Sequence, residues 1–458
     1  MNTILQQICE NFICDITTFF GRDKIVSLVE METSLKKRAD HFILEMMKAY
    51  MEQLDQAIVD DKSSRKKEGI VVERRADKRE LYTMFGHLSF ARTYFYDKKN
   101  KEYAYLLDKA VGLESYERVS NTVAIELVEH ASESSYGESS RHVTGGQISR
   151  QTVMRKLRKL EGLKVPIAPT KRQVKVLYVN ADEDHISLQN GKNSIVPLIS
   201  IHEGIARQGK RGRCINPHYI SSYGKDPEEL WLETAKWIYQ SYDENTLEAI
   251  YLHGDGASWI KTGLDWLPEA KFVLDRYHLN EAVITATGRQ QEKRFPLYKA
   301  LYTGDKASFI ALANQLKEDA TDESEKERIR KFTVYVKNNW AGIAIYSQED
   351  CGGSCTEGHV SHVLSSRLSS RPMGWGREGL RVMAELRAFK SSGGEVKVKH
   401  LGNPKFRCVL TNKMIKRANK SFKRISKEQF NNVKILSQGK IVPVFDCLRG
   451  LQHGRTDL

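Results

Sequence analysis

Apolar residues recur at helical spacing through the first part of the chain. The members of this pattern are Ile4, Leu5, Ile8 and Phe12, followed by Phe42, Ile43, Met46 and Met47. Repeats three and four positions apart predict two or three amphipathic helices, whose apolar faces pack within the chain or against a second copy. From about residue 70 the period shortens toward two, in the segments IVVE, LYTMFG, HLSFARTYFY and YAYLL. We therefore predict a helical region over 1–69 and a small β-meander over 70–118.

Residues 119–170 predict a helix-turn-helix region followed by a short linker. Thr144-Gly145-Gly146 forms a turn, and Ser149 is a suitable N-cap for a second helix. Apolar residues at i, i+4 and i+7 give that helix an inner face. Its outer face then carries Arg150, Gln151, Arg155 and Arg158. Such a helix suits the major groove of DNA, and an ordinary helical hairpin with a solvated basic face is the alternative.

The segment 171–278 predicts an α/β core. The expected elements are strands at 175–181, 185–189 and 194–201, a helix at 227–242, a strand at 247–252, a short helix at 257–264 and a strand at 271–274. Asn190-Gly191 is a strong hairpin signal between the second and third strands. Three antiparallel strands followed by helix, strand, helix and strand is the order of an RNase H-like core. In that fold, acidic residues on the first and fourth strands meet at one edge of the sheet.

The remaining residues predict an insertion, a returning helix and a tail. Positions 279–350 are almost entirely helical in pattern and highly charged, which is typical of an insertion. In the segment 351–390, Thr356 can cap a helix that holds Glu357 in its first turn, where the helix dipole favours a carboxylate. Residues 391–458 are basic and weakly periodic, and we assign them as a C-terminal extension that is either a DNA-contacting tail or a packed segment.

Three acidic residues lie where a two-metal phosphoryl-transfer site would need them. Asp182 and Asp255 follow or interrupt apolar β-rich runs, and Glu357 opens a helix. A pair of divalent ions needs such a carboxylate set in order to clamp the attacking and leaving oxygens of a phosphate. Each residue alone is more often a turn or cap residue. Together they predict metal-dependent chemistry on nucleic acid strands, with Mg²⁺ as the expected ion and Mn²⁺ as a substitute.

Neighbouring residues add candidates and one alternative. Asp184 shares a strand face with Asp182 and is the alternative first ligand. Arg367 and Arg371 follow Glu357 and are predicted near the site, where they hold phosphates or face solvent. A separate partial metal pattern consists of Cys351, Cys355 and His359. It lacks a fourth ligand, so we do not predict zinc there.

Composition supports a nucleic-acid partner and a reducing compartment. The chain has 458 residues with 72 Lys and Arg against 58 Asp and Glu, a net charge of +14 and a pI near 9.2. This balance favours a polyanionic partner held by counterion release. Seven Cys in a scattered set are expected to be reduced thiols. No apolar run approaches the length of a membrane span, and the start of the chain lacks the pattern of a signal peptide, so we expect a cytoplasmic protein without membrane contact.

Four sequence blocks resemble the signature blocks of ISLre-type bacterial insertion-sequence transposases, which are similar in turn to the Mutator-like DDE superfamily. The blocks are NADEDH, HGDGASW, VLDRYHLN and TEGHVSHVLSSRLSSRPMGWG, and the resemblance spans the chain. It implies that Asp182, Asp255 and Glu357 are the catalytic acids. In Mutator-like enzymes an Asp or Cys followed by His comes soon after the second Asp, which implies that Asp275 and His278 lie near the site.

The resemblance implies a transposase that binds the ends of its own element, then cuts and joins double-stranded DNA as a homodimer or larger assembly. A bacterial enzyme of this kind would associate with the nucleoid when bound to DNA. Two alternatives remain from the residues alone. One is a non-enzymatic helix-turn-helix regulator, and the other is a metal-dependent nuclease without strand transfer.

Overall fold

The computed structural model describes residues 4–21, 25–208, 211–288, 290–352, 356–371 and 373–402. Contacts divide them into two compact units. The first holds the described residues of 1–127 with 141–147 and residue 402, and the second holds 128–140 and the described residues of 148–401. The predicted C-terminal extension lies almost entirely outside the described residues. Among those described, no helix has both the length and the apolar character needed to cross a membrane.

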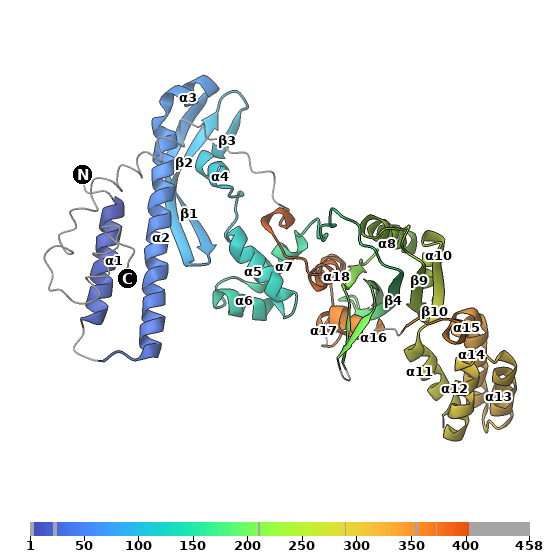
Figure 1. Cartoon of the computed structure of the whole chain (residues 1–458). Coiled ribbons are helices and arrows are strands. Elements are labelled where there is room, and N and C mark those ends of the chain that lie inside the picture. The colour runs from blue at the N-terminus through green and yellow to red at the C-terminus, as the bar shows by residue number, and fades with distance from the viewer. Residues whose placement is uncertain are drawn as a thin grey trace. The chain divides into compact units, whose positions relative to one another are not determined.

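The first unit is built from helices and a three-stranded antiparallel sheet of order β1-β2-β3 (Figure 1). Its elements are α1 (Ile4–Phe20), α2 (Leu28–Asp60), α3 (Lys62–Glu68), β1 (Ile70–Thr83), β2 (Gly86–Asp97), β3 (Glu102–Tyr105) and α4 (Leu106–Val111). Helix α2 packs against β2, and Ile58, Phe90 and Phe95 are buried between them. Along the chain, α5 (Asn121–Ala131) and α6 (Tyr136–Thr144) then lead to the second unit.

The meander differs from its prediction at two points. The predicted strand YAYLL ends early, because β3 stops at Tyr105 and Leu106 begins α4. The predicted strands IVVE and LYTMFG are a single strand, β1, because β2 pairs with it on both sides of the polar stretch between them. The register shifts between Val72 and Asp77, and Ala76 has a φ of 60° there. A bulge of this kind keeps polar residues within a strand, which the alternation pattern alone does not reveal.

The second unit contains a mixed five-stranded sheet with helices on both faces. The elements up to the end of this sheet are α7 (Arg150–Arg158), β4 (Val176–Ser187), β5 (Asn193–His202), β6 (Ile205–Gln208), β7 (Arg211–Cys214), β8 (His218–Ser221), α8 (Pro227–Ser241), β9 (Ala249–Gly254), α9 (Ser258–Lys261), α10 (Gly263–Trp266) and β10 (Ala270–Leu274). The strand order is β8-β5-β4-β9-β10. The β4–β5 and β5–β8 pairs are antiparallel, and the β4–β9 and β9–β10 pairs are parallel.

The two faces of this sheet have different chemistry. Alternate β4 residues such as Leu177 and Val179 point to one face, where they are buried with Trp231 and Ile238 of α8. The other β4 set, which includes Asn180, Asp182 and Asp184, points to the opposite face. Pro227 begins α8 as predicted, since its fixed φ suits the first helical turn.

Two predicted strand assignments in the core are wrong. The segments 175–181 and 185–189 form the single strand β4, which pairs with β5 without interruption from Tyr178 to Ser187. The third strand of the antiparallel series is β8, which was not predicted. Its four residues are too few to show a period, and pairing with β5 defines it as a strand. The predicted helix at 257–264 is divided into α9 and α10, and the other predicted elements of the core agree with the structure, with small shifts at their ends.

The segment between β10 and the returning helix is helical, as predicted. Its elements are α11 (Arg276–Thr287), η1 (Gln291–Lys293), α12 (Arg294–Tyr302), α13 (Lys306–Glu318), α14 (Glu323–Asn338) and α15 (Trp340–Gln348), and the chain continues with α16 (Thr356–Val360), η2 (Ser361–Ser365), α17 (Ser366–Leu368), α18 (Arg377–Ser391) and η3 (Val398–His400). Helices α11 to α14 lie together (Figure 1), and they share a core that includes Leu297, Phe309 and Phe332. Helix α15 packs against β10, and α16 packs against β4 and β5.

Candidate active site

Three aspartates from neighbouring strands meet at one end of the sheet. In the parallel β4–β9 pair Asn180 lies opposite His253, so the next residues on that face are Asp182 and Asp255. Asp275 follows the end of β10, and its backbone N–H donates to the carbonyl of Gly254, 2.8 Å away. The sequence predicted the pairing of the first two acids, and the structure brings Asp275 beside them.

Local hydrogen bonds direct each of these carboxylates. Asp182 is buried, and its Oδ1 accepts from the N–H of Glu183 at 2.8 Å. Asp255 is partly exposed, and its Oδ1 accepts from the N–H of Ala257 at 2.8 Å. Asp275 is 1% exposed and caps α11 by accepting from the N–H of Tyr277 at 2.7 Å. Backbone donors therefore orient all three carboxylates.

His278 lies beside Asp182, Asp255 and Asp275, which together are called the acidic group below. Its Nε2 lies 3.8 Å from Asp182 Oδ2, which is an ion-pair separation and longer than a hydrogen bond. The interaction with Asp182 raises the pKa of His278, the charges of Asp275 and Asp255 act in the same direction, and burial opposes them. The imidazole therefore holds its proton more tightly than an isolated histidine does.

Glycines on both sides of Asp255 permit its position. Gly256 has a φ of +92°, and a Cβ there would lie 2.5 Å from Asn339 Oδ1. A Cβ at Gly254 would lie 2.8 Å from the side chain of Ile260 and 3.1 Å from the carbonyl of Ala181. The motif HGDGASW thus has a physical reason for both glycines, because neighbours leave no room for a side chain at Gly254 and the backbone of Gly256 is left-handed.

The helical insertion supports the strand ends that carry the aspartates. The Tyr335 hydroxyl, on α14, donates to the backbone carbonyl of Asp255 at 2.8 Å. The Tyr346 hydroxyl, on α15, donates to the carbonyl of Leu274, the residue before Asp275. Burial raises the pKa of both tyrosines, and the nearby aspartate charges add to the effect, so both hydroxyls remain protonated donors. No local pattern in the sequence indicates these contacts.

Asp184, the alternative first ligand, has a different environment. Its Oδ2 accepts from the Ser369 hydroxyl at 2.9 Å, and burial raises the pKa of the carboxyl group. The charges that act on His278 are those of Asp182, Asp255 and Asp275. The geometry therefore groups Asp182 with the other aspartates, while Asp184 faces the segment that follows α16.

Glu357 lies in α16, although the position of its side chain lies outside the described part of the structure. The helix is fixed to the polar face of the sheet by His359. Its Nδ1 lies 2.7 Å from Ser200 Oγ on β5, and its Nε2 lies 3.4 Å from Cys214 Sγ on β7. Asn180 of β4 in turn donates to Ser200 Oγ at 3.3 Å. This network connects the Glu357 helix to the strand that carries Asp182.

The remaining predicted residues have varied positions. The Arg367 guanidinium is buried, donates to the carbonyl of Ala131 at 2.9 Å and lies over the Trp375 ring. Burial lowers its pKa to about 10. This placement does not fit the expected phosphate-holding role, because the side chain is committed to packing. Arg371 is exposed. Cys351 is buried, Cys355 lies outside the described residues, and His359 joins the network above.

The donor set suits a hard divalent cation, since the aspartates supply oxygen ligands. Within the part of the chain that the structure describes, no group of three or more His, Cys, Asp or Glu side chains has a geometry that could hold a metal ion. The Glu357 carboxylate lies outside that part. Asp182 and Asp255, with Asp275 beside them, are the residues that would hold an ion here.

The second helix of the predicted helix-turn-helix is α7. Ser149 caps it as predicted, with its hydroxyl accepting from the N–H of Thr152 at 3.3 Å. Val153 and Leu157 are fully buried, and α7 packs against α18. The predicted DNA-binding residues Arg150, Gln151, Arg155 and Arg158 are all exposed. The outer face of α7 is therefore basic and accessible.

Comparison with known proteins identifies a family. The chain matches the family model described as "Uncharacterised protein family (UPF0236)" over residues 22–405. One UPF0236 protein of Caldanaerobacter subterraneus is 39% identical over 465 residues, which is 99% of this chain and 100% of the relative. A second from the same organism is 40% identical and covers 94% of this chain and 93% of its own length. A UPF0236 protein of Streptococcus gallolyticus is 25% identical and covers 80% of this chain and 83% of its own length. The chain belongs to the UPF0236 family.

Proposed function

We propose that this protein is a DDE-type DNA transposase with an RNase H-like catalytic core. The observation that carries the proposal is the meeting of Asp182, Asp255 and Asp275 at one end of the sheet. The strand order β8-β5-β4-β9-β10, with three antiparallel strands and two parallel ones, is the arrangement expected of an RNase H-like sheet. The sequence blocks that resemble ISLre-type transposases fall on these strand ends and on α16.

The expected reaction is transfer of a phosphodiester linkage. Water attacks the scissile phosphorus, the P–O3′ bond breaks, and a 3′-hydroxyl and a 5′-phosphate are released. The 3′-hydroxyl then attacks a phosphodiester of the target DNA, so one linkage forms as another breaks. Divalent ions such as Mg²⁺, bound by Asp182, Asp255 and Glu357, would stabilise charge on the attacking and leaving oxygens. His278 lies beside these acids and would offer a ring N–H donor to a phosphate oxygen.

Binding of DNA is supported by charge and by α7. The net charge of +14 favours a polyanion. The exposed residues Arg150, Gln151 and Arg155 give α7 donors for base edges and phosphates. Cutting both ends of an element calls for at least a dimer on DNA, although the structure describes one chain.

The relatives support a mobile element. The name of one of them combines eleven loci of a single Caldanaerobacter subterraneus genome. Repeated copies in one genome are typical of sequences that move. By similarity over 94% of this chain, we extend that property to the present protein.

The test is cleavage and strand transfer on labelled DNA that carries the two ends of the element, in Mg²⁺. The wild-type chain should cut and join, and Asp255→Asn should bind the DNA without cutting it. Asp265→Asn is a matched control, because Asp265 is exposed on α10 and lies outside the acidic group.

Each of the other outcomes would indicate a different function for this protein. Cleavage by wild type without joining to a target would indicate a nuclease. Specific binding without cleavage, in Mg²⁺ or in Mn²⁺, would indicate a DNA-binding regulator. Equal cleavage by wild type and Asp255→Asn would remove this residue from the site.

A further inference from the structure

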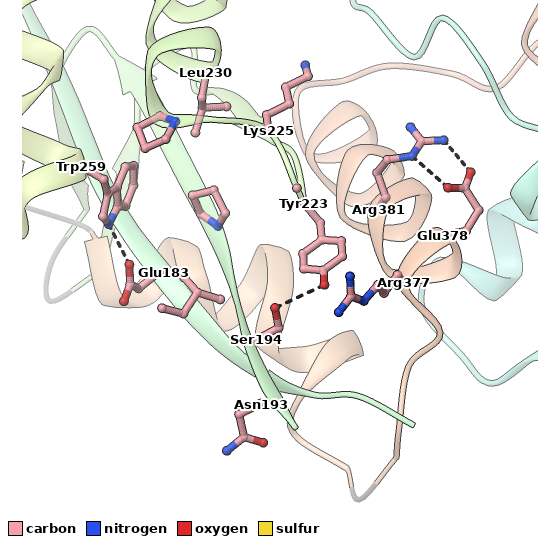
Figure 2. Close-up of a pocket in the computed structure, with 14 residues that line it drawn as sticks. Glu183, Asn193, Ser194, Tyr223, Lys225, Leu230, Trp259, Arg377, Glu378 and Arg381 are labelled. Atoms are coloured by element: carbon pink, nitrogen blue, oxygen red, sulfur yellow. Dashed lines mark hydrogen bonds and ion pairs between the residues drawn. The ribbon is translucent and has the colours of Figure 1, made fainter. Parts of the chain in front are cut away.

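A pocket of about 740 Å³ opens next to the acidic group, on the other face of β4 (Figure 2). Its walls come from the β4–β5 hairpin, from the segment between β8 and α8, from α9 and from the start of α18. This volume lies within the roughly 300–1,000 Å³ range of sites that hold small organic ligands. The reaction proposed above uses none of its lining residues.

The pocket is close to the acidic residues along the chain and lies across the sheet from them. Glu183 lines it, and this residue stands on β4 between Asp182 and Asp184. Trp259 lines it as well, four positions after Asp255, and its indole N–H donates to Glu183 Oε2 at 2.7 Å. Consecutive residues of a strand are about 3.3 Å apart and point to opposite faces. The pocket and Asp182 are therefore one residue apart along β4 but on opposite faces of the sheet.

The lining has the mixed chemistry that a nucleobase requires. Ile195, which is 47% exposed, and Pro197 provide apolar surface, and the Tyr223 and Trp259 rings stand at opposite sides of it. Polar groups are present for the edge of a base, since Ser194 donates from its hydroxyl to the Tyr223 oxygen at 3.3 Å. Aromatic rings and apolar surface accept any base by stacking, and nearby polar groups read its edge.

The guanidinium of Arg377 lies at the rim of the pocket, where it can bind a phosphate. Figure 2 shows the Arg377 guanidinium directed into the pocket toward the Tyr223 hydroxyl. Within the part of the chain that the structure describes, Arg377 has no ion-pair partner. Arg381, by contrast, already pairs with Glu378 and Glu385 at 2.7 and 3.0 Å. A guanidinium without a carboxylate partner is well suited to a DNA phosphate.

We propose that this pocket binds one unpaired nucleotide of the DNA, flipped out of the helix. The proposal rests on the proposed function, because it needs DNA as the ligand. A base within an intact duplex cannot enter, so binding must first unstack it. That cost is smallest for a nucleotide that is already unpaired.

The experiment compares the affinity of the full chain for two fluorescein-labelled duplexes. They share one sequence, and one of them carries a single unpaired nucleotide. Measurements are made at fixed salt in Ca²⁺, which suppresses cleavage. Wild type should bind the duplex with the unpaired nucleotide at least about tenfold more tightly than the paired duplex. Ile195→Asp and Arg377→Ala should reduce that ratio to near one, with affinity for the paired duplex changed much less.

The control variant is Leu232→Asp, since Leu232 is 45% exposed on α8 and does not line the pocket. It introduces the same charge and should keep the wild-type ratio. Thermal unfolding of each variant shows whether a reduced ratio comes from impaired folding. If both pocket variants still bind the duplex with the unpaired nucleotide about tenfold more tightly, the proposal is overturned. The preference would then come from bending of the DNA at the unpaired nucleotide.

The two proposals fail in different ways. Wild type that cleaves element ends but shows no preference for the unpaired nucleotide would refute the pocket and leave the transposase intact. Wild type that binds neither duplex and cuts no element end would refute both.

Discussion

The hydroxyl of Tyr335 offers a test of how the helical insertion supports the site. It donates to the carbonyl of Asp255 at 2.8 Å, from a half-buried side chain that packs against the core of the insertion. Tyr335→Phe removes this donor while it keeps the ring, so the change creates almost no cavity. The carbonyl of Asp255 is then left without that partner.

The expected cost follows from the missing hydrogen bond. Leaving a buried acceptor unsatisfied costs about 1–3 kcal/mol. For a unit of this size, that corresponds to a fall of about 2–4 °C in melting temperature per kcal/mol. The rate of DNA cleavage should fall by more than the loss in the free energy of unfolding explains, because Asp255 can then shift. A shift of about 1 Å in a catalytic group can reduce the rate about a hundredfold. Thermal unfolding and DNA cleavage at a temperature well below the transition measure the two effects.

Tyr298→Phe is the matched control, because Tyr298 lies on α12 of the same insertion and stacks on Tyr302. Its hydroxyl has no hydrogen bond to another described residue. The control should change neither stability nor cleavage appreciably. If Tyr335→Phe behaves in the same way as this control, the insertion does not hold Asp255 in place, and its supporting role is refuted.

Three further predictions concern DNA, pH and backbone geometry. Arg155→Ala on α7 should reduce the slope of log affinity against log salt by about 0.9 for each DNA phosphate that the arginine binds, in a salt titration of duplex binding. Burial lowers the pKa of His202 and of His218 to about 4, below the unfolded value near 6.5. Each should therefore contribute stability that is complete above about pH 6.5 and falls by about 1.4 kcal/mol per pH unit toward pH 4; His218→Phe should lose less stability between pH 7 and 5 than wild type does. Gly256→Ala, at a φ of +92°, should cost about 1–3 kcal/mol in urea unfolding, whereas Gly137→Ala, with no neighbour within 4 Å of the added Cβ, should cost far less.

Local signals in the sequence predicted several elements of the second unit. Pro227 at a helix start, Ser149 at a cap and the apolar runs of β9 and β10 each depend on a few neighbouring residues. The prediction that Asp182 and Asp255 lie close together then followed from the expected fold, in which these strands bring their acidic residues to one edge of the sheet. Such inferences succeed because hydrophobic period and capping are properties of short segments.

Contacts between distant segments could not be predicted in this way. His359 meets Cys214 across 145 positions, and strand β8 exists because it pairs with β5. Arg367 is buried over Trp375, whereas an arginine in a polar segment is ordinarily exposed. In each case the tertiary partner determines the role of the residue, and one sequence does not contain that partner's location.

The proposed chemistry requires the aspartates at the sheet end to hold divalent ions. Mn²⁺ binding, followed by electron paramagnetic resonance on the full chain with and without element-end DNA, tests this requirement most directly. We predict that wild type binds Mn²⁺ at this site, that Asp182→Asn and Asp255→Asn weaken this binding by at least about tenfold, and that Asp265→Asn does not. Equal Mn²⁺ binding by wild type, Asp182→Asn and Asp255→Asn would contradict the assignment of these aspartates as metal ligands.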